Sequence, residues 1–285
     1  MCLAVIALDA HPRYAVVIAA NRDEFHARPS APARWWTDDR GNALLAGRDL
    51  EHGGTWLGVA RNGRFAFVTN VREPGRHDPR APSRGVLVPA LLGDPRSIGV
   101  ALQELIADAR GYNGFNLVAA DPAGAVFGSN RGAHSVALGR GVHGVSNAGL
   151  DTPWPKLVRA KAGLARWIAS GNDPPDALWP VLADRTPAAD DELPETGLSR
   201  ERERLLSSPF IVSDTYGTRC STLVAMARDG NVDFIERSFD ADGALAGEVA
   251  YRFASQPGLR SPAMPSARSG RGLAAQLDLT LRDDA

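Results

Sequence analysis

Short apolar runs separated by turn-forming residues dominate the first 70 residues of this chain. Residues 3–8 and 14–20 form one pair of runs, and residues 56–60 and 65–70 form another. The dipeptide Asn62-Gly63 lies between the runs of the second pair. It predicts a type I′ hairpin, because both residue types tolerate positive φ. Two hairpins this early in the chain indicate an antiparallel sheet.

Helical signals follow these strands. Ser83 can cap a short helix that ends at Leu92, and Asp94 can cap a second helix. The strongest helical pattern has Thr152 as its N-cap and Gly171 as its stop, with an apolar stripe between them. Further strands are predicted at residues 115–120, 125–129, 142–147, 222–227, 232–237 and 248–253. Strand pairs, then helices, then strand pairs are the order of an α+β protein.

The length of the chain bounds its domain organisation. With 285 residues and 44% hydrophobic content, it can bury one large core. We therefore predict a single domain over residues 1–254. Residues 255–285 are rich in Ser, Pro, Gly and Arg, a composition that predicts a mobile C-terminal tail.

Charge and composition argue against several classes of function. The 32 basic and 33 acidic residues nearly cancel, so we expect no nucleic-acid partner. No apolar run is long enough to span a membrane, and the apolar start lacks the basic segment of a signal peptide. We therefore predict a cytoplasmic protein. Two cysteines are too few for a disulfide framework and the six histidines lack metal-ligand spacing, so neither a metal site nor a required cofactor is predicted.

Cys2 carries a specific chemical possibility because it follows Met1. Removal of Met1 would leave a thiol and a free α-amine on the same residue. The α-amine titrates near neutrality and can accept the thiol proton, as in other N-terminal nucleophiles, so no histidine is needed. The alternative interpretation is a buried strand cysteine.

Four polar residues, 21–24, follow the predicted second strand. A hairpin with residues 3–8 would bring them back to the end of the sheet that carries Cys2. Arg22 could then lower the pKa of the thiol, and an acid could accept a hydrogen bond from the α-ammonium group. The alternative is a solvated turn with internal salt bridges.

Several motifs together carry a resemblance to a known family. They are Met1-Cys2-Leu3, Ala20-Asn21-Arg22-Asp23-Glu24-Phe25, Gly53-Gly54-Thr55-Trp56-Leu57-Gly58, Thr69-Asn70-Val71-Arg72, Gly111-Tyr112-Asn113-Gly114-Phe115-Asn116-Leu117, Ser146-Asn147, Pro153-Trp154-Pro155-Lys156 and Gly217-Thr218-Arg219-Cys220-Ser221-Thr222. Over residues 1 to 254 the chain resembles the NRDE family, also called the transport and Golgi organization protein 2 family.

The resemblance implies a four-layer αββα sandwich of the N-terminal-nucleophile hydrolase type, related to penicillin V acylases, bile-salt hydrolases and acid-ceramidase-like amidases. By similarity to those relatives, the implied catalytic residues are Cys2, Arg22, Asp23, Asn70, Asn147 and Arg219. In the relatives the acid lies a few residues beyond the arginine, whereas here Asp23 is adjacent to Arg22 and Glu24 comes next. Either acid can therefore be the one that orients the site.

The implied residues also have plain structural interpretations. Asn70 and Asn147 can donate to an oxyanion or align the α-amine, or they can cap turns. Arg219 can anchor a substrate carboxylate, or it can be a surface strand residue. The predicted ligand-binding residues are Asn21, Glu24, Trp56 and Trp154. The two glycines before Trp56 allow either a tight bend that places the Trp56 side chain in the core or a pocket wall formed by this side chain. Of these two interpretations, the pattern favours the core position.

Two functions are compatible with these residues. The first is cysteine-dependent hydrolysis of a non-peptide amide through an acyl-enzyme. The second, implied by the family, is non-catalytic binding and trafficking of haem or of a lipid or acyl-CoA ligand in the same cavity, with Cys2 as a possible axial ligand to haem. A scaffold role is a third option that no motif favours. In the first two cases the expected partner is a small molecule.

Overall fold

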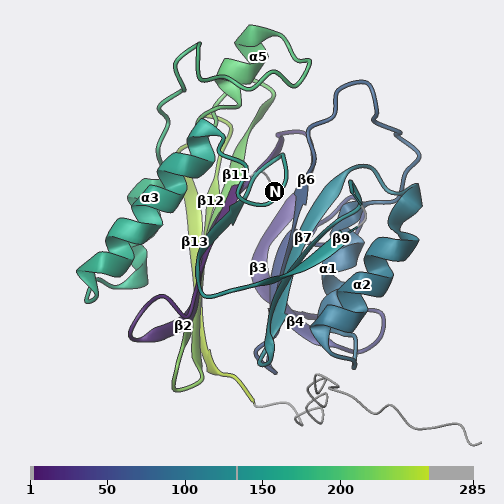
Figure 1. Ribbon diagram of the computed structural model, residues 1–285, viewed down its shortest axis with the longest axis vertical. Coiled ribbons are helices and arrows are strands. Elements are labelled where there is room, and N and C mark those ends of the chain that lie inside the picture. Colours follow the sequence, from purple (N-terminus) through teal and green to yellow (C-terminus); the bar gives the residue numbers. More distant parts are fainter. Residues whose placement is uncertain (1–2, 133, 257–285) are drawn as a thin grey trace, which may run out of the picture.

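The computed structural model describes residues 3–132 and 134–256. In this part of the chain two antiparallel sheets face each other, and helices cover their outer faces (Figure 1). The first sheet has the order β10-β1-β2-β11-β12-β13, with β1 at Leu3–Leu8, β2 at Tyr14–Phe25, β10 at Gly141–Val145, β11 at Tyr216–Ala227, β12 at Asn231–Phe239 and β13 at Leu245–Ala254. The second runs in sequence order from β3 to β9: Ser30–Thr37, Ala43–Asp49, Leu57–Ala60, Phe65–Asn70, Phe115–Asp121, Gly124–Ser129 and His134–Leu138.

The helices lie mostly outside the two sheets. They are α1 (Leu87–Leu92), α2 (Ile98–Asp108), α3 (Pro155–Ser170), α4 (Trp179–Leu182) and α5 (Arg200–Leu205), with short 3₁₀ turns η1 (Arg84–Val86), η2 (Ala109–Gly111) and η3 (Pro175–Leu178). α1 and α2 cover the second sheet and α3 covers the first (Figure 1). The predicted α+β class and the four-layer αββα arrangement are therefore confirmed.

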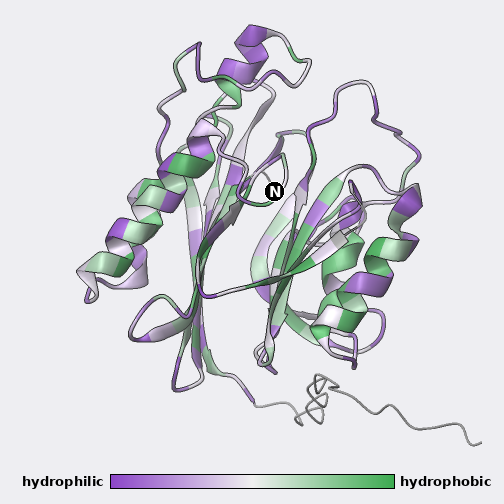
Figure 2. Cartoon of the chain, in the orientation of Figure 1, coloured by the Kyte–Doolittle hydropathy of each residue, from purple (hydrophilic) through white to green (hydrophobic). Residues whose placement is uncertain are grey.

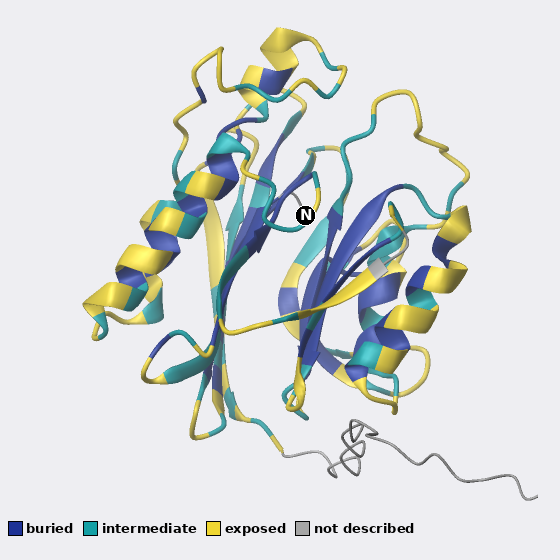
Figure 3. Ribbon diagram, in the orientation of Figure 1, coloured by how far each residue is buried: buried dark blue, intermediate teal, exposed yellow. Residues whose placement is uncertain are grey.

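Both faces of β1 are buried, which explains its continuous apolar sequence. Ala4, Ile6 and Leu8 belong to the core between the two sheets. The intervening residues, such as Leu3 and Val5, pack on the other face against α3. Figure 3 shows this buried layer in dark blue along the strands. The alternation of side chains along a strand thus divides one short segment between two cores.

α3 is amphipathic and packs on the first sheet through one face. Leu157, Leu164 and Trp167 are buried there, and hydrophilic and hydrophobic bands alternate along the helix (Figure 2). The helix stops at Gly171, which is left-handed (φ 71°) as its sequence predicts. The predicted start was wrong: Trp154 is the N-cap, because the Thr152 hydroxyl is already used in a turn, where it donates to the Gly149 carbonyl (3.0 Å).

The polar segment 21–24 does not form a solvated turn, which was the alternative interpretation of these residues. It belongs to β2, which continues to Phe25 because β11 pairs with it as far as Tyr216. β11 itself begins six residues before the predicted strand. A long partner strand therefore holds the polar residues in the sheet, and they do not form a solvated turn.

Some local predictions fail for reasons of backbone geometry or composition. At the β5–β6 hairpin only Gly63 has positive φ (82°), so the turn is not type I′. Asn62 instead accepts a hydrogen bond from the Arg64 backbone (3.1 Å) through its side chain.

The second helix begins after Ser97 rather than at Asp94. The strands β3, β4 and β9 were not predicted, because their sequences mix charged, proline or polar residues with apolar ones.

Candidate functional site

The family motif on β2 is divided between the two faces of the first sheet. Arg22 points toward the space between the sheets, where its guanidinium stacks on the Trp56 ring (4.4 Å). Asn21 points the other way and donates to the carbonyls of Leu182 (2.8 Å) and Pro209 (2.9 Å). Successive side chains of a strand face opposite sides, so Arg22 and Asp23 serve different surroundings although they are adjacent in sequence.

Arg22 is a buried cation with spare hydrogen-bonding capacity. Its side chain is 4% exposed, and its nearest carboxylate contact is Nη2 to Glu24 Oε2 at 3.9 Å. Nη1 is buried and has no hydrogen-bond partner in the described part of the chain. Buried polar atoms are normally satisfied, so this open donor marks a position where an anionic group can bind.

The Gly-Gly-Thr-Trp motif places Trp56 beneath Arg22. A Cβ on Gly54 would lie 2.4 Å from the Gly85 carbonyl carbon, and a Cβ on Gly47 would lie 2.3 Å from the Trp56 ring. Only glycine permits these close approaches. Trp56 belongs to the core between the sheets and also lines a cavity, so its core and pocket-wall interpretations both apply.

The two candidate acids occupy different networks. Asp23 is 2% exposed, and its Oδ1 accepts a hydrogen bond from the Thr218 hydroxyl (2.7 Å). Glu24 is half-buried and lies 3.8 Å from Arg28, which also pairs with Asp49 (2.6 Å). Burial raises the pKa of Asp49, but the hydrogen bonds from Arg28 and from the Glu51 backbone outweigh burial, and the net effect lowers it.

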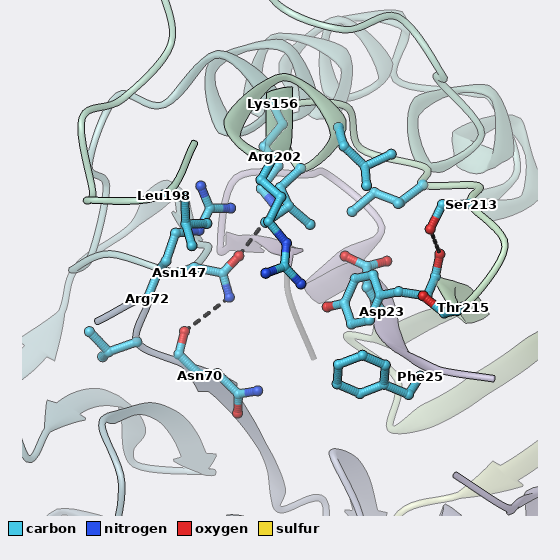
Figure 4. Close-up of a pocket in the computed structure, with 15 residues that line it drawn as sticks. Asp23, Phe25, Asn70, Arg72, Asn147, Lys156, Leu198, Arg202, Ser213 and Thr215 are labelled. Atoms are coloured by element: carbon cyan, nitrogen blue, oxygen red, sulfur yellow. Dashed lines mark hydrogen bonds between the residues drawn. The ribbon is translucent and has the colours of Figure 1, made fainter. Parts of the chain in front are cut away.

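Two asparagines and a lysine form a chain of contacts opposite Asp23 (Figure 4). Asn147 Nδ2 donates to the Asn70 carbonyl (3.0 Å), and Asn147 Oδ1 accepts from Lys156 Nζ (3.3 Å). The Arg72 backbone N–H donates to the Asn147 carbonyl (2.7 Å). These bonds connect the end of β6 to the segment between β10 and α3 and fix the position of Asn70.

Two cavities share Asn70 in their linings. The first, which we call the Arg202 cavity, has a volume of about 380 Å³, and its lining includes Asp23, Asn70, Asn147, Lys156 and Arg202. The second, which we call the Arg22 cavity, has a volume of about 270 Å³, and its lining includes Arg22, Glu24, Trp56, Asn70 and Arg84. Asn70 lines both. The alternation along β2 therefore assigns Asp23 to one cavity and Arg22 with Glu24 to the other.

Comparisons with known proteins agree with this arrangement of motifs. The sequence model of the family Transport and Golgi organisation 2 matches residues 1–241. The chain belongs to this family. It is 36% identical over 259 residues to the "Transport and Golgi organization protein 2 homolog" of Bos taurus, covering 84% of this chain and 93% of the relative. It is 34% identical over 278 residues to the Homo sapiens homologue, covering 90% of this chain and 100% of the relative.

Two solved structures are similar at low sequence identity. One is an N-acylethanolamine-hydrolyzing acid amidase orthologue from Caenorhabditis elegans, with a TM-score of 0.44, 11% identity, and coverage of 78% of this chain and 92% of that chain. The other is a single-residue variant of a conjugated bile acid hydrolase from Clostridium perfringens, with a TM-score of 0.46, 9% identity, and coverage of 91% of this chain and 99% of that chain.

The structure gathers part of the predicted set around the two cavities. Arg22, Asp23, Glu24, Trp56, Asn70 and Asn147 all line one or both of them. Cys2 lies outside the described residues. Its covalent neighbour Leu3 pairs with Asn21 on β2, directly beside Arg22 and Asp23.

Three other predicted residues line neither cavity. Asn21 is fully buried, and its Oδ1 accepts from the Ser221 hydroxyl (2.6 Å) in addition to its two donor bonds, so its polar group is satisfied. Arg219 lies at a β-bulge and donates to the carbonyls of Phe25 (3.2 Å) and His26 (2.9 Å). Trp154 supports the site through Arg72, whose guanidinium lies 4.7 Å from its ring.

Sequence reasoning missed the cations of the Arg202 cavity. Lys156 is 2% exposed, which is unusual for lysine. The sequence contained a sign that Lys156 is special. Only two residues of the chain are lysines, and this one lies in the Pro-Trp-Pro-Lys motif. Arg72 forms a buried ion pair with Glu203 of α5. Glu203 and Arg202 gave no signal, since they lie in a charged stretch that resembles an ordinary exposed helix.

Cys220 is chemically distinct from the predicted nucleophile. Burial raises the pKa of its thiol well above the usual value, and the neighbouring Glu236 carboxyl raises it further. A protonated, buried thiol is a poor nucleophile. In the described residues no group of three or more potential metal ligands occurs, and no helix is both long and apolar enough to cross a membrane.

Proposed function

We propose that this protein is a cysteine-dependent amidohydrolase that cleaves a non-peptide amide, with Cys2 as the nucleophile after removal of Met1. The observation that carries the proposal is the convergence of Arg22, Asp23 and Asn70 at the end of β2 where Leu3, the neighbour of Cys2, is paired. These groups supply a cation, an acid and an amide at one edge between two cavities.

The first half of the proposed reaction forms an acyl-enzyme. The α-amine of Cys2 takes the thiol proton, and the thiolate attacks the substrate carbonyl carbon. The resulting oxyanion accepts a hydrogen bond from the Asn70 side-chain amide, which has no hydrogen-bond partner in the described structure. The C–N bond then breaks, and the α-ammonium group gives its proton to the leaving amine.

The second half releases the acid. Water loses a proton to the α-amine and attacks the thioester carbon, the C–S bond breaks, and the thiolate recovers the proton. Asn147 acts as a positioning residue in this scheme, because its side chain already bonds the Asn70 carbonyl and Lys156. Asp23, held by Thr218, is the acid we assign to orienting the α-ammonium group, since Glu24 is engaged with Arg28.

A second candidate function is retention of a ligand without turnover. The mixed lining of the Arg202 cavity, with leucines beside Lys156 and Arg202, favours an apolar anion. Haem or a lipid or acyl-CoA ligand has this character, and Cys2 would supply a thiolate to haem iron. A Soret shift on haem titration that is identical in wild type and Cys2→Ala would refute a thiolate-bound haem.

The decisive experiment on hydrolysis combines intact mass with trapping of the acyl-enzyme. We expect native protein to lack Met1 and to accumulate a covalent acyl adduct when incubated with activated amides. The adduct should persist in Cys220→Ser and disappear in Cys2→Ala. Complete retention of Met1 in the native protein would exclude the free-amine mechanism.

A further inference from the structure

The Arg202 cavity contains a positive charge that forms no ion pair within residues 3–132 and 134–256. Arg202 lies on α5, is exposed, and forms no ion pair with any carboxylate of the described residues. Figure 4 shows its side chain reaching into the middle of the cavity, between Asn147 and Asp23. Its neighbour on the same helix, Arg204, instead pairs with Asp190 outside the cavity (2.5 Å).

The other charges of the cavity do not cancel this one. Arg72 is already balanced by Glu203. Lys156 is a second cation of the lining, and its Nζ donates to Asn147 Oδ1 (3.3 Å). Among the described residues that line the cavity, Asp23 is the single carboxylate. With Lys156 and Arg202 against Asp23, the lining has a net positive charge, which attracts an anion.

Apolar side chains surround these cations. Leu198, Leu205 and Leu206 from the α5 segment line the same cavity, together with Phe25 from β2. Phe25 and Leu205 are 52% and 36% exposed, so large apolar groups face the open volume. Apolar walls around a few placed charged groups are typical of ligand pockets.

The second cavity differs in character. The Arg22 cavity is lined by the carboxylates Glu24, Asp49, Glu51 and Asp78 and by several cationic groups, with few apolar side chains. Several of its charges are paired, as between Arg28 and Asp49 (2.6 Å), whereas Arg22 keeps an open donor at Nη1. A molecule that lies across Asn70 therefore meets an apolar, cationic surface on one side and a polar surface with charges of both signs on the other.

From these features we infer that the Arg202 cavity binds the apolar, negatively charged half of the substrate, and that Arg202 is the residue that selects its anionic group. The inference rests on the proposed function and specifies its substrate class: an amide whose apolar half carries an acidic group, such as a carboxylate or a phosphate, separate from the amide carbonyl, and whose other half is polar. Arg202 holds the anionic group, the leucines and Phe25 contact the apolar chain, and the polar half lies beyond Asn70.

Binding can be measured without turnover in a Cys2→Ala background. The probe is dansylaminoundecanoate, whose fluorescence reports burial, and its methyl ester is the uncharged control. We expect the carboxylate to bind at least about 10-fold more tightly than the ester, the effect of one charged hydrogen bond. Dodecanoate and dodecyl phosphate should both displace it, and dodecanol should do so only weakly.

Substitutions on one helix separate a specific contact from general charge. Arg202→Gln should weaken binding of the carboxylate probe by about 10-fold or more and leave binding of the ester unchanged. Arg202→Lys should retain most of the affinity for the carboxylate probe. Arg200→Gln removes the same charge from an exposed residue of α5 that does not line the cavity. This control variant should bind the carboxylate probe with the same affinity as the Cys2→Ala protein.

The outcomes also separate this inference from the proposed function. Equal binding of carboxylate and ester, or wild-type affinity in Arg202→Gln, would overturn the inference even if Cys2 forms an acyl-enzyme. Selective anion binding that depends on Arg202 would support it even in a protein that hydrolyses no amide.

Discussion

Glu236 on β12 is a buried acid between the two sheets, and its titration should control stability near neutral pH. Its Oε1 accepts from the Ala33 backbone N–H of the facing sheet (2.7 Å), and its Oε2 accepts from the Thr222 hydroxyl (3.1 Å). Burial raises the pKa of Glu236 from 4.5 to about 7, although these hydrogen bonds and Arg22 act in the opposite direction. We predict that Glu236→Gln stabilises the protein at alkaline pH relative to wild type.

The sign follows from proton linkage. Below pH 4.5 the carboxyl is protonated in both the folded and the unfolded chain. Between pH 4.5 and about 7 only the folded protein keeps the proton, so wild-type stability falls as the pH rises through this window. A pKa rise from 4.5 to about 7 corresponds to about 3 kcal/mol, at about 1.4 kcal/mol for each tenfold change in proton affinity.

Urea unfolding of both proteins from pH 5 to pH 8 tests this prediction. Glutamine can keep both hydrogen bonds, because its oxygen accepts from Ala33 and its amide can donate to the Thr222 hydroxyl. The free energy of unfolding of Glu236→Gln relative to wild type should increase by about 2–3 kcal/mol across this range. Other titrating groups are common to both proteins and cancel. Parallel curves for the two proteins would refute the buried-acid reasoning.

Three further perturbations test the packing and the thiol chemistry. Gly54→Ala would force a Cβ to 2.4 Å from a facing backbone carbon, and urea unfolding should show a loss of about 1–3 kcal/mol, whereas Gly111→Ala, with no atom within 4 Å, should change little. Glu203→Gln leaves Arg72 buried without its carboxylate. The free energy of unfolding should fall by about 3–5 kcal/mol, which thermal unfolding would show as a lower melting temperature, and an unchanged melting temperature would contradict this. Cys220 should resist iodoacetamide in the native protein and react in urea, because it is buried and its pKa is raised, and rapid native labelling mapped to this residue would show otherwise.

Much of the fold could be predicted from local sequence. β1 and β6 have the predicted bounds, because their apolar runs are uninterrupted and end at turn residues. α3 was also predicted, apart from its start. The strands β3, β4 and β9 were not, because each mixes polar and apolar residues in a way that only the neighbouring strands make regular.

For the candidate site, the sequence named residues but not their arrangement. The motifs named Arg22, Asp23, Asn70 and Asn147, and the structure places all four around the two cavities. They could not reveal that Asn21 is a satisfied structural residue, because its partners lie 161 or more residues away in the chain.

The sequence by itself determined the uninterrupted apolar strands, the helix α3, the family and the identity of the polar residues on β2, because these depend on short-range pattern and on motifs. The tertiary structure decided which of those residues meet. The pairing of β2 with β11 extended the strand through the polar segment and, by alternation, sent Arg22 and Asp23 to different cavities. The contact between α5 and Arg72 placed Arg202 in the cavity that Lys156 also lines. Such contacts join segments far apart in the chain, so local sequence does not encode them.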